Sequence, residues 1–441
     1  MKNQSKVILA IGLGFGDEGK GSVTSYLAQV HNAKLVCRFN GGGQAAHSVT
    51  KGSKHHIFSQ WGSGTFEPGC DTFLSKYMLV QPGAMLSEAK HLESVGIADP
   101  FKRMFIEDCA LVTTRFHMAV NRLREMHRSK NCHGSCGMGI NETVVDSQEG
   151  LGLHVAGMQN PSKLRAQLKR LQGFNRAKVE DIFKALPESA DRDREWLWLN
   201  DPSKVEAEAE TCEAMAKQVK VVGPSWLKQQ LQAPGTVLFE GAQGVLLDQF
   251  SGFMPHCTRS NTTFANADAL LKECNFEGQV TRMGILRTYL TRHGDGPLPT
   301  EDPGLLEGRE EPYNTYNSWQ HGFRAGHFDL VLLRYAIKAC RSIDTLAITH
   351  MDKLAENPKV CIAYKGQPEM GLPTSLAEQH KLNERLEIAE PVYTTSKDFI
   401  DTIEAAEGVP VSLLSFGPTT EDKVKCETRR KSAWPSLNTE I

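Results

Sequence analysis

The chain has no run of about 18 consecutive apolar residues, the length that a helix needs to cross a bilayer. The sequence therefore predicts no membrane-spanning helix and no membrane partner. Its first residues are charged and then apolar, as in a signal peptide, but no small-residue cleavage site follows them. Glycines and charged residues come next, which favours a buried strand that enters a loop.

The chain also has little net charge, because 50 Lys and Arg residues nearly balance 52 Asp and Glu residues and leave −2 at pH 7. We therefore expect no electrostatic attraction to nucleic acid. Internal repeats, low-complexity tracts and long linkers rich in Gly, Ser or Pro are absent as well. These absences favour one large domain over residues 1–441, with a loose tail at 426–441, over a string of modules.

The eleven cysteines lack any repeated spacing. An odd, dispersed set in a long chain is typical of reduced thiols, so we expect a cytoplasmic protein. Cys132 and Cys136 form the one close pair, with His133 between them. Two further ligands at a suitable spacing are missing, which argues against a structural zinc site.

Strand and helix signals alternate along the chain. Apolar runs at residues 7–11 and 33–39 enclose an expected helix at 23–30, and a charged, helix-favouring stretch lies at 201–220. Further apolar runs, several ending in glycine or polar residues, lie at 235–244, 279–290, 344–352 and 410–418. The pattern predicts an α/β fold with a central, mostly parallel sheet, a phosphate-loop-like strand–loop–helix at the N-terminus and inserted helical segments.

The first loop, residues 12–22, reads GLGFGDEGKGS and contains five glycines. It fits two phosphate-binding motifs. Gly14, Gly16 and Gly19 match the G-x-G-x-x-G dinucleotide fingerprint, and Arg38 ends the next strand where an NADP enzyme places a basic residue. Residues 14–20 also match the G-x-x-x-x-G-K part of a phosphate loop, although the Ser or Thr that should follow is a glycine.

Two acidic residues decide between these motifs. Asp17 and Glu18 would repel a bound pyrophosphate unless a metal ion or a proton-transfer step requires them. The dinucleotide fingerprint accounts for neither carboxylate. The loop therefore favours a site that binds a transferable phosphate and also handles a proton.

At this loop the chain resembles the adenylosuccinate synthetase family, whose G-D-E-G-K-G hallmark matches residues 16–21. Seven more family segments follow in the same order, and the resemblance runs from about residue 5 to residue 425. These segments lie at residues 40–48, 133–140, 240–248, 260–263, 291–301, 349–352 and 415–418. Collinear order makes the resemblance far more specific than any single segment.

The resemblance implies a GTP-dependent ligase. GTP would phosphorylate the C6 oxygen of a 6-oxopurine nucleotide, and an amine such as aspartate would then displace the phosphate. Asp17 would take the N1 proton and bind magnesium together with the carbonyl of Ala46. Lys20 and His47 would assist transfer of the phosphoryl group, and Gln243 would hold the developing oxyanion.

The resemblance also implies two binding sites and a homodimer. Asp352 would select guanine by accepting from its N1–H and amino group. The GTP site would consist of Gly16, Glu18, Gly19, Lys20, Gly21, His350, Asp352, Ser415 and Gly417. The acceptor and the amine would contact Gln44, Ser135, Cys136, Thr258, His293, His321 and Arg324.

The amine pocket departs from the family pattern. The family binds aspartate with arginines, but Met138, His321 and Phe323 fall on arginine positions and only Arg324 remains. Segment 144–152, which would supply a phosphate-binding arginine from the partner subunit, has no basic residue. A dicarboxylate without bidentate arginines loses its strongest partners. A specialised synthetase for a modified purine or purine-like acceptor and a different amine therefore stays open.

Two alternatives lie outside this class. One is an NADP-binding oxidoreductase, which the dinucleotide fingerprint allows. The other is a catalytically inactive nucleotide-binding regulator, which the retained Asp17, Lys20 and His47 argue against. Protection against melting by GTP supports a synthetase, and protection by NADPH supports an oxidoreductase.

Overall fold

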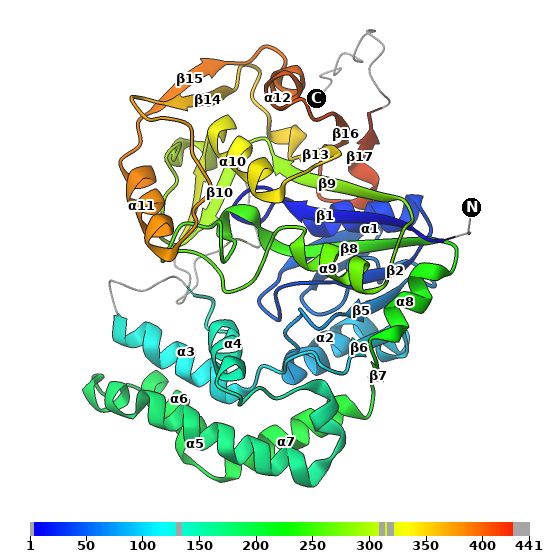
Figure 1. The fold of residues 1–441 in the computed structure, drawn as a ribbon, viewed down its shortest axis with the longest axis vertical. Coiled ribbons are helices and arrows are strands. Elements are labelled where there is room, and N and C mark those ends of the chain that lie inside the picture. The colour runs from blue at the N-terminus through cyan, green and yellow to red at the C-terminus, as the bar shows by residue number, and fades with distance from the viewer. Residues whose placement is uncertain (1–3, 129–134, 308–313, 315–321, 427–441) are drawn as a thin grey trace.

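The computed structural model describes residues 4–128, 135–307, 314 and 322–426. Within these residues a ten-stranded sheet crosses the molecule, and helices cover both of its faces (Figure 1). Every pair of neighbouring strands in it is parallel except β16 and β17. The predicted α/β fold with a central, mostly parallel sheet is confirmed.

The strand order joins distant parts of the sequence. Across the sheet the strands are β17 (Lys423–Lys425), β16 (Val411–Ser415), β13 (Thr345–Thr349), β9 (Val280–Arg287), β1 (Lys6–Gly12), β8 (Thr236–Gly244), β2 (Ala33–Arg38), β5 (Asp71–Leu74), β6 (Met104–Glu107) and β7 (Lys220–Val222). The apolar runs that the sequence singles out lie in β1, β2, β8, β9, β13 and β16. Because these strands are parallel, their carboxyl ends lie at one edge of the sheet, where loops can form a site.

The central strand β1 buries side chains on both faces. Leu9 packs in the core cluster that includes α9 (Ala265–Glu273) and α10 (Leu330–Cys340). Its neighbour Ala10 packs on the other face, in the cluster that includes α1 (Lys20–Val30). A strand covered on both faces explains the continuous apolar run in the sequence.

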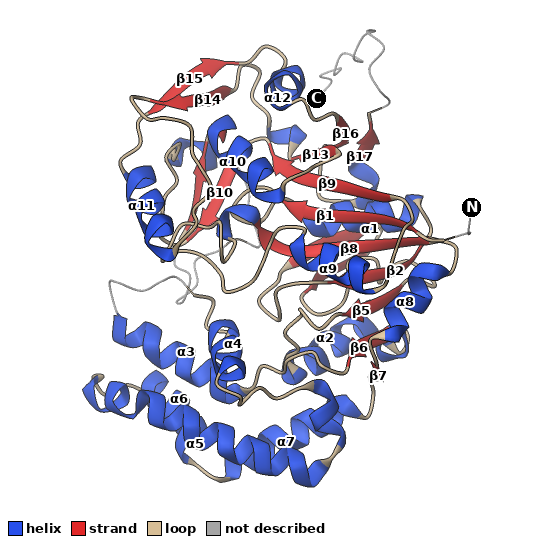
Figure 2. Ribbon diagram, in the orientation of Figure 1, coloured by secondary structure: helices blue, strands red, loops and turns tan. Residues whose placement is uncertain are grey.

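A helical layer is inserted between strands β6 and β7. Figure 2 shows its helices gathered below the sheet. They are α3 (Arg115–Arg128), α4 (Ile140–Gln148), α5 (Pro161–Ala185), α6 (Ala190–Asn200) and α7 (Ser203–Ala216). The buried carboxylate of Asp146 on α4 accepts hydrogen bonds from Asn175 (2.7 Å) and Lys178 on α5. The prediction of inserted helical segments is confirmed.

Smaller elements complete the described chain. Strands β3 (His47–Lys51) and β4 (Lys54–Phe58) form a hairpin, and β10 (Leu290–His293) pairs antiparallel with the distant strand β11 (Phe323–Gly326). A three-stranded sheet contains β12 (Phe328–Asp329), β14 (Lys359–Tyr364) and β15 (Pro391–Thr395), and the other helices are α2 (Pro82–Ser94), α8 (Ser225–Gln232), α11 (Leu376–Glu387) and α12 (Phe399–Glu407). In the part of the chain that the structure describes, none of the helices has the length and apolar character of a membrane span.

Candidate active site

The loop between β1 and α1 has an unusual backbone. Gly16 (φ 103°) and Gly19 (φ 84°) take the left-handed conformation that glycine adopts without strain. Asp17, between them, also has a positive φ of 61°, which is rare for a residue with a side chain. Gln243 (φ 63°) and His350 (φ 59°) share this feature. Such strained residues cluster at functional sites, and these three are all predicted site residues.

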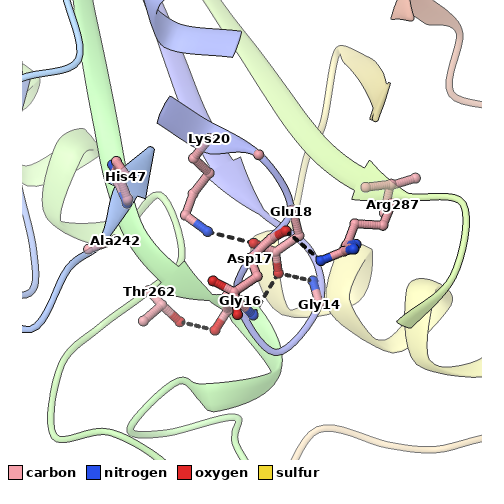
Figure 3. A network of polar contacts seen from close by, with 12 residues as sticks. Gly14, Gly16, Asp17, Glu18, Lys20, His47, Ala242, Thr262 and Arg287 are labelled. Carbon is pink, nitrogen blue, oxygen red and sulfur yellow. Dashed lines mark hydrogen bonds and ion pairs between the residues drawn. The ribbon is translucent and has the colours of Figure 1, made fainter. Parts of the chain in front are cut away.

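The side chain of Glu18 fills the inside of this loop. Its carboxylate accepts hydrogen bonds from the backbone N–H groups of Gly14 (3.0 Å) and Gly16 (2.8 Å), and Lys20 Nζ lies 2.5 Å away (Figure 3). Glu18 is only 2% exposed, so its charge depends on these partners. The carboxylate thus takes the amides and the lysine that a phosphate loop offers to phosphate oxygens. Its predicted contact with GTP stays a prediction.

The glycines around Glu18 make room for it. A Cβ atom added at Gly12 would overlap the Glu18 carboxylate, and one added at Gly244 would overlap both that carboxylate and the Gly14 carbonyl. Gly12 and Gly244 also face each other in the β1–β8 register. These glycines therefore serve the close packing of strands and loop around one buried carboxylate.

Asp17 lies between a histidine and an arginine. Its carboxylate is 2.9 Å from His293 Nε2, and its backbone carbonyl accepts a hydrogen bond from Arg287 (3.3 Å). Burial raises the pKa of Asp17, but the hydrogen bond from His293 and the charges of His293, Arg287 and Lys20 outweigh it. The pKa of Asp17 is therefore lowered, and its carboxylate is ionised near neutral pH, as a proton acceptor requires.

His47 is held by a carboxylate that sequence reasoning did not select. Its Nδ1 lies 2.6 Å from Glu240, which also accepts hydrogen bonds from the backbone N–H (2.9 Å) and hydroxyl of Ser63. Burial raises the pKa of Glu240, but the charges of His47 and Arg38 outweigh it and lower this pKa. An ionised carboxylate only accepts hydrogen bonds, so Nδ1 carries the proton and the ring orientation is fixed.

Several buried polar atoms here lack partners. His47 Nε2, Gln243 Oε1 and both amide atoms of Gln44 have no hydrogen bond within the described chain. Asn40 and Ala242 exchange hydrogen bonds of 3.0 and 2.8 Å, which ties the loop of Gln44 to the end of β8 that carries Gln243. An unsatisfied buried polar group costs about 1–3 kcal/mol, so these atoms mark a place for a ligand.

The predicted guanine site forms where β13 and β16 end side by side, with Ile348 paired to Leu414. His350 and Asp352 follow β13, while Ser415 ends β16 and donates to the Gly417 carbonyl (3.0 Å). The structure therefore brings the four predicted guanine-site residues to one edge of the sheet.

Two further contacts shape this site. Thr349 donates to the Glu18 carbonyl (2.9 Å), which links it to the first loop. Lys423 donates to the Gly417 carbonyl (3.1 Å), and burial lowers the pKa of Lys423 to about 8 although Asp422, Glu421 and Asp352 oppose the shift. Burial, together with the charge of Arg287, also holds the pKa of His350 well below its ordinary value. His350 is thus a neutral hydrogen-bonding group at this site.

The predicted acceptor residues are spread over several elements. Ser135 accepts a hydrogen bond from Asn121 (2.8 Å) just before α4, and the neighbouring Cys136 has its thiol pKa raised by burial. The backbone N–H of Thr258 donates to Leu247 (2.8 Å). None of these contacts tests a role in ligand binding, so these roles stay predictions.

Two positions bear on the amine pocket. Met138 lies beside the loop of Gln44, because a Cβ atom at Gly43 would be 3.5 Å from its methyl carbon. Arg324 donates to the carbonyls of Gly294 (2.9 Å) and Gly296 (2.7 Å) and pairs with Glu301 (2.6 Å). Its guanidinium thus holds the loop after β10. The third predicted residue, His321, lies outside the described residues.

The site offers oxygen donors to a metal ion. In the described ranges, no group of three or more His, Cys, Asp or Glu side chains is placed to hold a metal by itself. The carboxylate of Asp17 and the backbone carbonyl of Ala46 are hard oxygen donors, and Ala46 is an exposed residue. Magnesium commonly takes one or two protein oxygens and completes its shell with substrate phosphates and water. The donor set therefore fits magnesium bound together with a nucleotide.

The fold and the site define a nucleotide-binding α/β enzyme. The family model for adenylosuccinate synthetase matches residues 9–424. The chain belongs to the adenylosuccinate synthetase family, whose members are GTP-dependent ligases that form carbon–nitrogen bonds. The resemblance inferred from the sequence motifs is confirmed.

Three known proteins show how far the similarity extends. The adenylosuccinate synthetase of Chlorobium chlorochromatii is 30% identical over 94% of this chain and 96% of its own. The fully ligated adenylosuccinate synthetase of Plasmodium falciparum has a TM-score of 0.77 at 20% identity, covering 96% of this chain and all of its own. Cyanophage S-2L succinoaminodeoxyadenylate synthetase, bound to dGMP and to dATP as an energy donor, has a TM-score of 0.57 at 17% identity, covering 96% and 95%. The two solved structures support the fold alone.

Substitution of Gly12 tests the packing around Glu18. We expect Gly12→Ala to lower the free energy of unfolding by about 1–3 kcal/mol, the usual cost of overpacking, because the new methyl group displaces the carboxylate. Urea denaturation measures this change. The matched control is Gly173→Ala on α5, where no atom lies within 4 Å and the change should stabilise by about 0.5–1 kcal/mol. Equal stability of Gly12→Ala and the parent protein would contradict the packing argument.

Proposed function

We propose that this protein uses GTP to phosphorylate the C6 oxygen of a 6-oxopurine nucleotide such as IMP, after which an amine displaces the phosphate. The supporting observation is a set of buried polar atoms without partners, on His47, Gln243 and Gln44, beside the loop that carries Asp17 and Lys20. Figure 3 shows His47, Lys20 and Asp17 around this loop. Membership of the family supplies the reaction class.

The first step requires a base. The C6 oxygen of such a purine is a poor nucleophile until N1 loses its proton. Asp17 is ionised and a little under one third exposed, so its carboxylate is available to the substrate. Asp17 would accept the N1 proton as the oxygen attacks the terminal phosphate of GTP.

The second group of residues would stabilise the phosphoryl group during transfer. Lys20 would neutralise its charge. His47 would donate to it from Nε2 as the imidazolium, because its Nδ1–H already faces Glu240 and a neutral ring has no second N–H. Burial lowers the pKa of His47, so the negative charge of the bound phosphates would have to favour this protonated form. Asp17 and the Ala46 carbonyl would hold magnesium, which supplies further charge neutralisation when bound. Gln243 would donate its side-chain amide to the C6 oxygen as negative charge develops there.

The surroundings of the predicted amine pocket favour a second candidate function. Met138 lies beside the Gln44 loop, and the Arg324 guanidinium is held by Gly294, Gly296 and Glu301. These contacts support a specialised synthetase that joins a less charged amine to a purine or purine-like acceptor. The cyanophage relative with bound dGMP and dATP makes these nucleotides informative probes.

Assembly and location complete the proposal. We infer a homodimer and a cytoplasmic location, as expected for this family. The cysteines of the described residues are free thiols, including the exposed Cys109, which supports a reducing compartment. Sedimentation would show a monomer if the dimer is wrong.

Phosphate release assayed over a grid of substrates tests the proposed function. The grid combines GTP, ATP or dATP with IMP or dGMP, and with aspartate or less charged amines. We expect turnover with GTP and a 6-oxopurine nucleotide, and weak use of aspartate, because each missing charge-assisted hydrogen bond forfeits about 1.5–3 kcal/mol. Ordinary turnover with micromolar Michaelis constants for IMP and aspartate would exclude the specialised synthetase. Protection against melting by NADPH and not GTP would favour an oxidoreductase.

The catalytic assignments predict graded losses. We expect Asp17→Asn to remove turnover by several orders of magnitude, and His47→Asn to lower kcat about 100-fold or more, the scale of one transition-state donor. Glu240→Gln keeps the shape but cannot hold the ring as firmly, so an intermediate loss is expected. Single-turnover phosphate release gives all three values. Parent-like rates in both Asp17→Asn and His47→Asn would refute the site assignment.

Nucleotide choice tests Asp352. An asparagine at this position has one acceptor oxygen where aspartate has two, so either the guanine N1–H or the guanine amino group would face an N–H group without an acceptor. We expect Asp352→Asn to reduce the preference for GTP over ITP or ATP by about 1–3 kcal/mol in kcat/KM. The matched control is Asp344→Asn, directly before β13 and at the opposite end of that strand from Asp352. Equal use of ATP and GTP by the parent protein would contradict this role.

A further inference from the structure

The strongest contact on the carboxylate of Asp17 comes from a residue that the sequence placed only in the acceptor and amine pocket. His293 ends strand β10, and its Nε2 lies 2.9 Å from Asp17 Oδ2. Arg287 also binds Asp17, but at the backbone carbonyl (3.3 Å). Arg287 therefore orients the main chain, while His293 contacts the group that would accept the proton.

His293 is held from its partner strand. It pairs with Phe323 across the antiparallel strands β10 and β11, and the two ring centroids lie 5.0 Å apart with an interplanar angle of 56°. Phe323 occupies a position where the family motif has an arginine for the dicarboxylate. The aromatic ring at this position thus supports the histidine that contacts Asp17.

The loop that follows His293 is also rigidly held. Buried Arg292 donates to the carbonyls of Asp295 (3.0 Å), Pro297 (2.9 Å) and His256 (3.0 Å). Arg324, which lies opposite Arg292 in the β10–β11 pair, donates to the carbonyls of Gly294 and Gly296 in the same loop. Two arginines therefore fix the backbone on which His293 stands, so its Nε2 has a defined position.

We propose that His293 is a positioning residue for the proposed reaction: its Nε2–H holds one carboxylate oxygen of Asp17 and leaves the lone pairs of the other oxygen for the purine N1–H and for magnesium. This inference rests on the proposed function. Asp17 and His293 are 29% and 23% exposed, so both face a space that a substrate can enter. Fixing a reacting group in its productive orientation before substrate binds lowers the barrier of the step.

The role explains the changed pocket. In the β10–β11 pair, Arg324 is retained but donates to the loop after β10, and Phe323 packs against His293. These two strands would therefore hold the proposed proton acceptor, Asp17, in place and would not bind a dicarboxylate. A positioning role of this kind does not need a charged amine.

Two substitutions at His293 separate the hydrogen bond from the space it fills. His293→Leu removes the donor, whereas His293→Gln can place an amide N–H near the position of Nε2. We expect kcat of His293→Leu to fall about 10- to 100-fold, the factor of one hydrogen bond to a charged group, with KM for GTP within about twofold. We expect His293→Gln to recover most of this loss. His380→Leu, at an exposed site on α11, is the matched control and should keep the parent rate.

Parent-like kcat in His293→Leu would overturn the inference, as would equal losses in the Leu and Gln variants. A double-mutant cycle with Asp17→Ala and His293→Leu gives a readout independent of activity. We expect the two losses in unfolding free energy to be less than additive, because either change alone removes the shared contact. If the losses in unfolding free energy were additive while the parent protein turned over its substrates, the positioning role of His293 would be overturned and the proposed function would stand. No turnover by the parent with any substrate pair would overturn the proposed function, while the cycle would still report on the contact.

Discussion

The site depends on one buried carboxylate. Glu18 is enclosed by the amides of Gly14 and Gly16 and by Lys20, and an isolated charge at this depth would be very costly. Its enclosure requires glycine at positions where strands β1 and β8 come together. The tight turn around Glu18 also places Asp17 at positive φ, so the loop accepts local strain while it leaves a second carboxylate partly exposed.

The same loop connects the separate parts of the site. Thr349, at the end of β13 and beside the predicted guanine site, donates to the Glu18 carbonyl, and Arg287, at the end of β9, donates to the Asp17 carbonyl. On the opposite side, Gly244 lies against the Gly14 carbonyl directly after Gln243. Strands β13, β9, β1 and β8 are neighbours in the sheet, so each delivers its contact at the same edge. The parallel sheet thus converts distant sequence segments into one rigid frame around the first loop.

The sequence was sufficient for six of the ten described strands of the sheet and for many residues at its edge, because apolar runs and ordered motifs are local signals. It did not place Glu18 inside the loop, and it missed Glu240 behind His47, although Glu240 belongs to a motif that the sequence singles out. Arg287 and Ser63 carried no local signal at all. The contacts of Glu240 with His47 and Ser63, and of Arg287 with Asp17, join segments that are more than 100 residues apart along the chain, and only the fold brings these segments together.

The antiparallel pair β10–β11 shows why a retained residue type does not imply a retained role. Arg324 matches the family motif, yet its guanidinium forms hydrogen bonds to Gly294 and Gly296 and an ion pair with Glu301. Breaking these bonds to bind a ligand would leave carbonyls without donors, so the ligand would have to replace all of them. A dicarboxylate supplies acceptors and no such donors. The energetic balance at this strand pair therefore favours a fixed loop beside His293 and Asp17 over an arginine that turns toward a ligand.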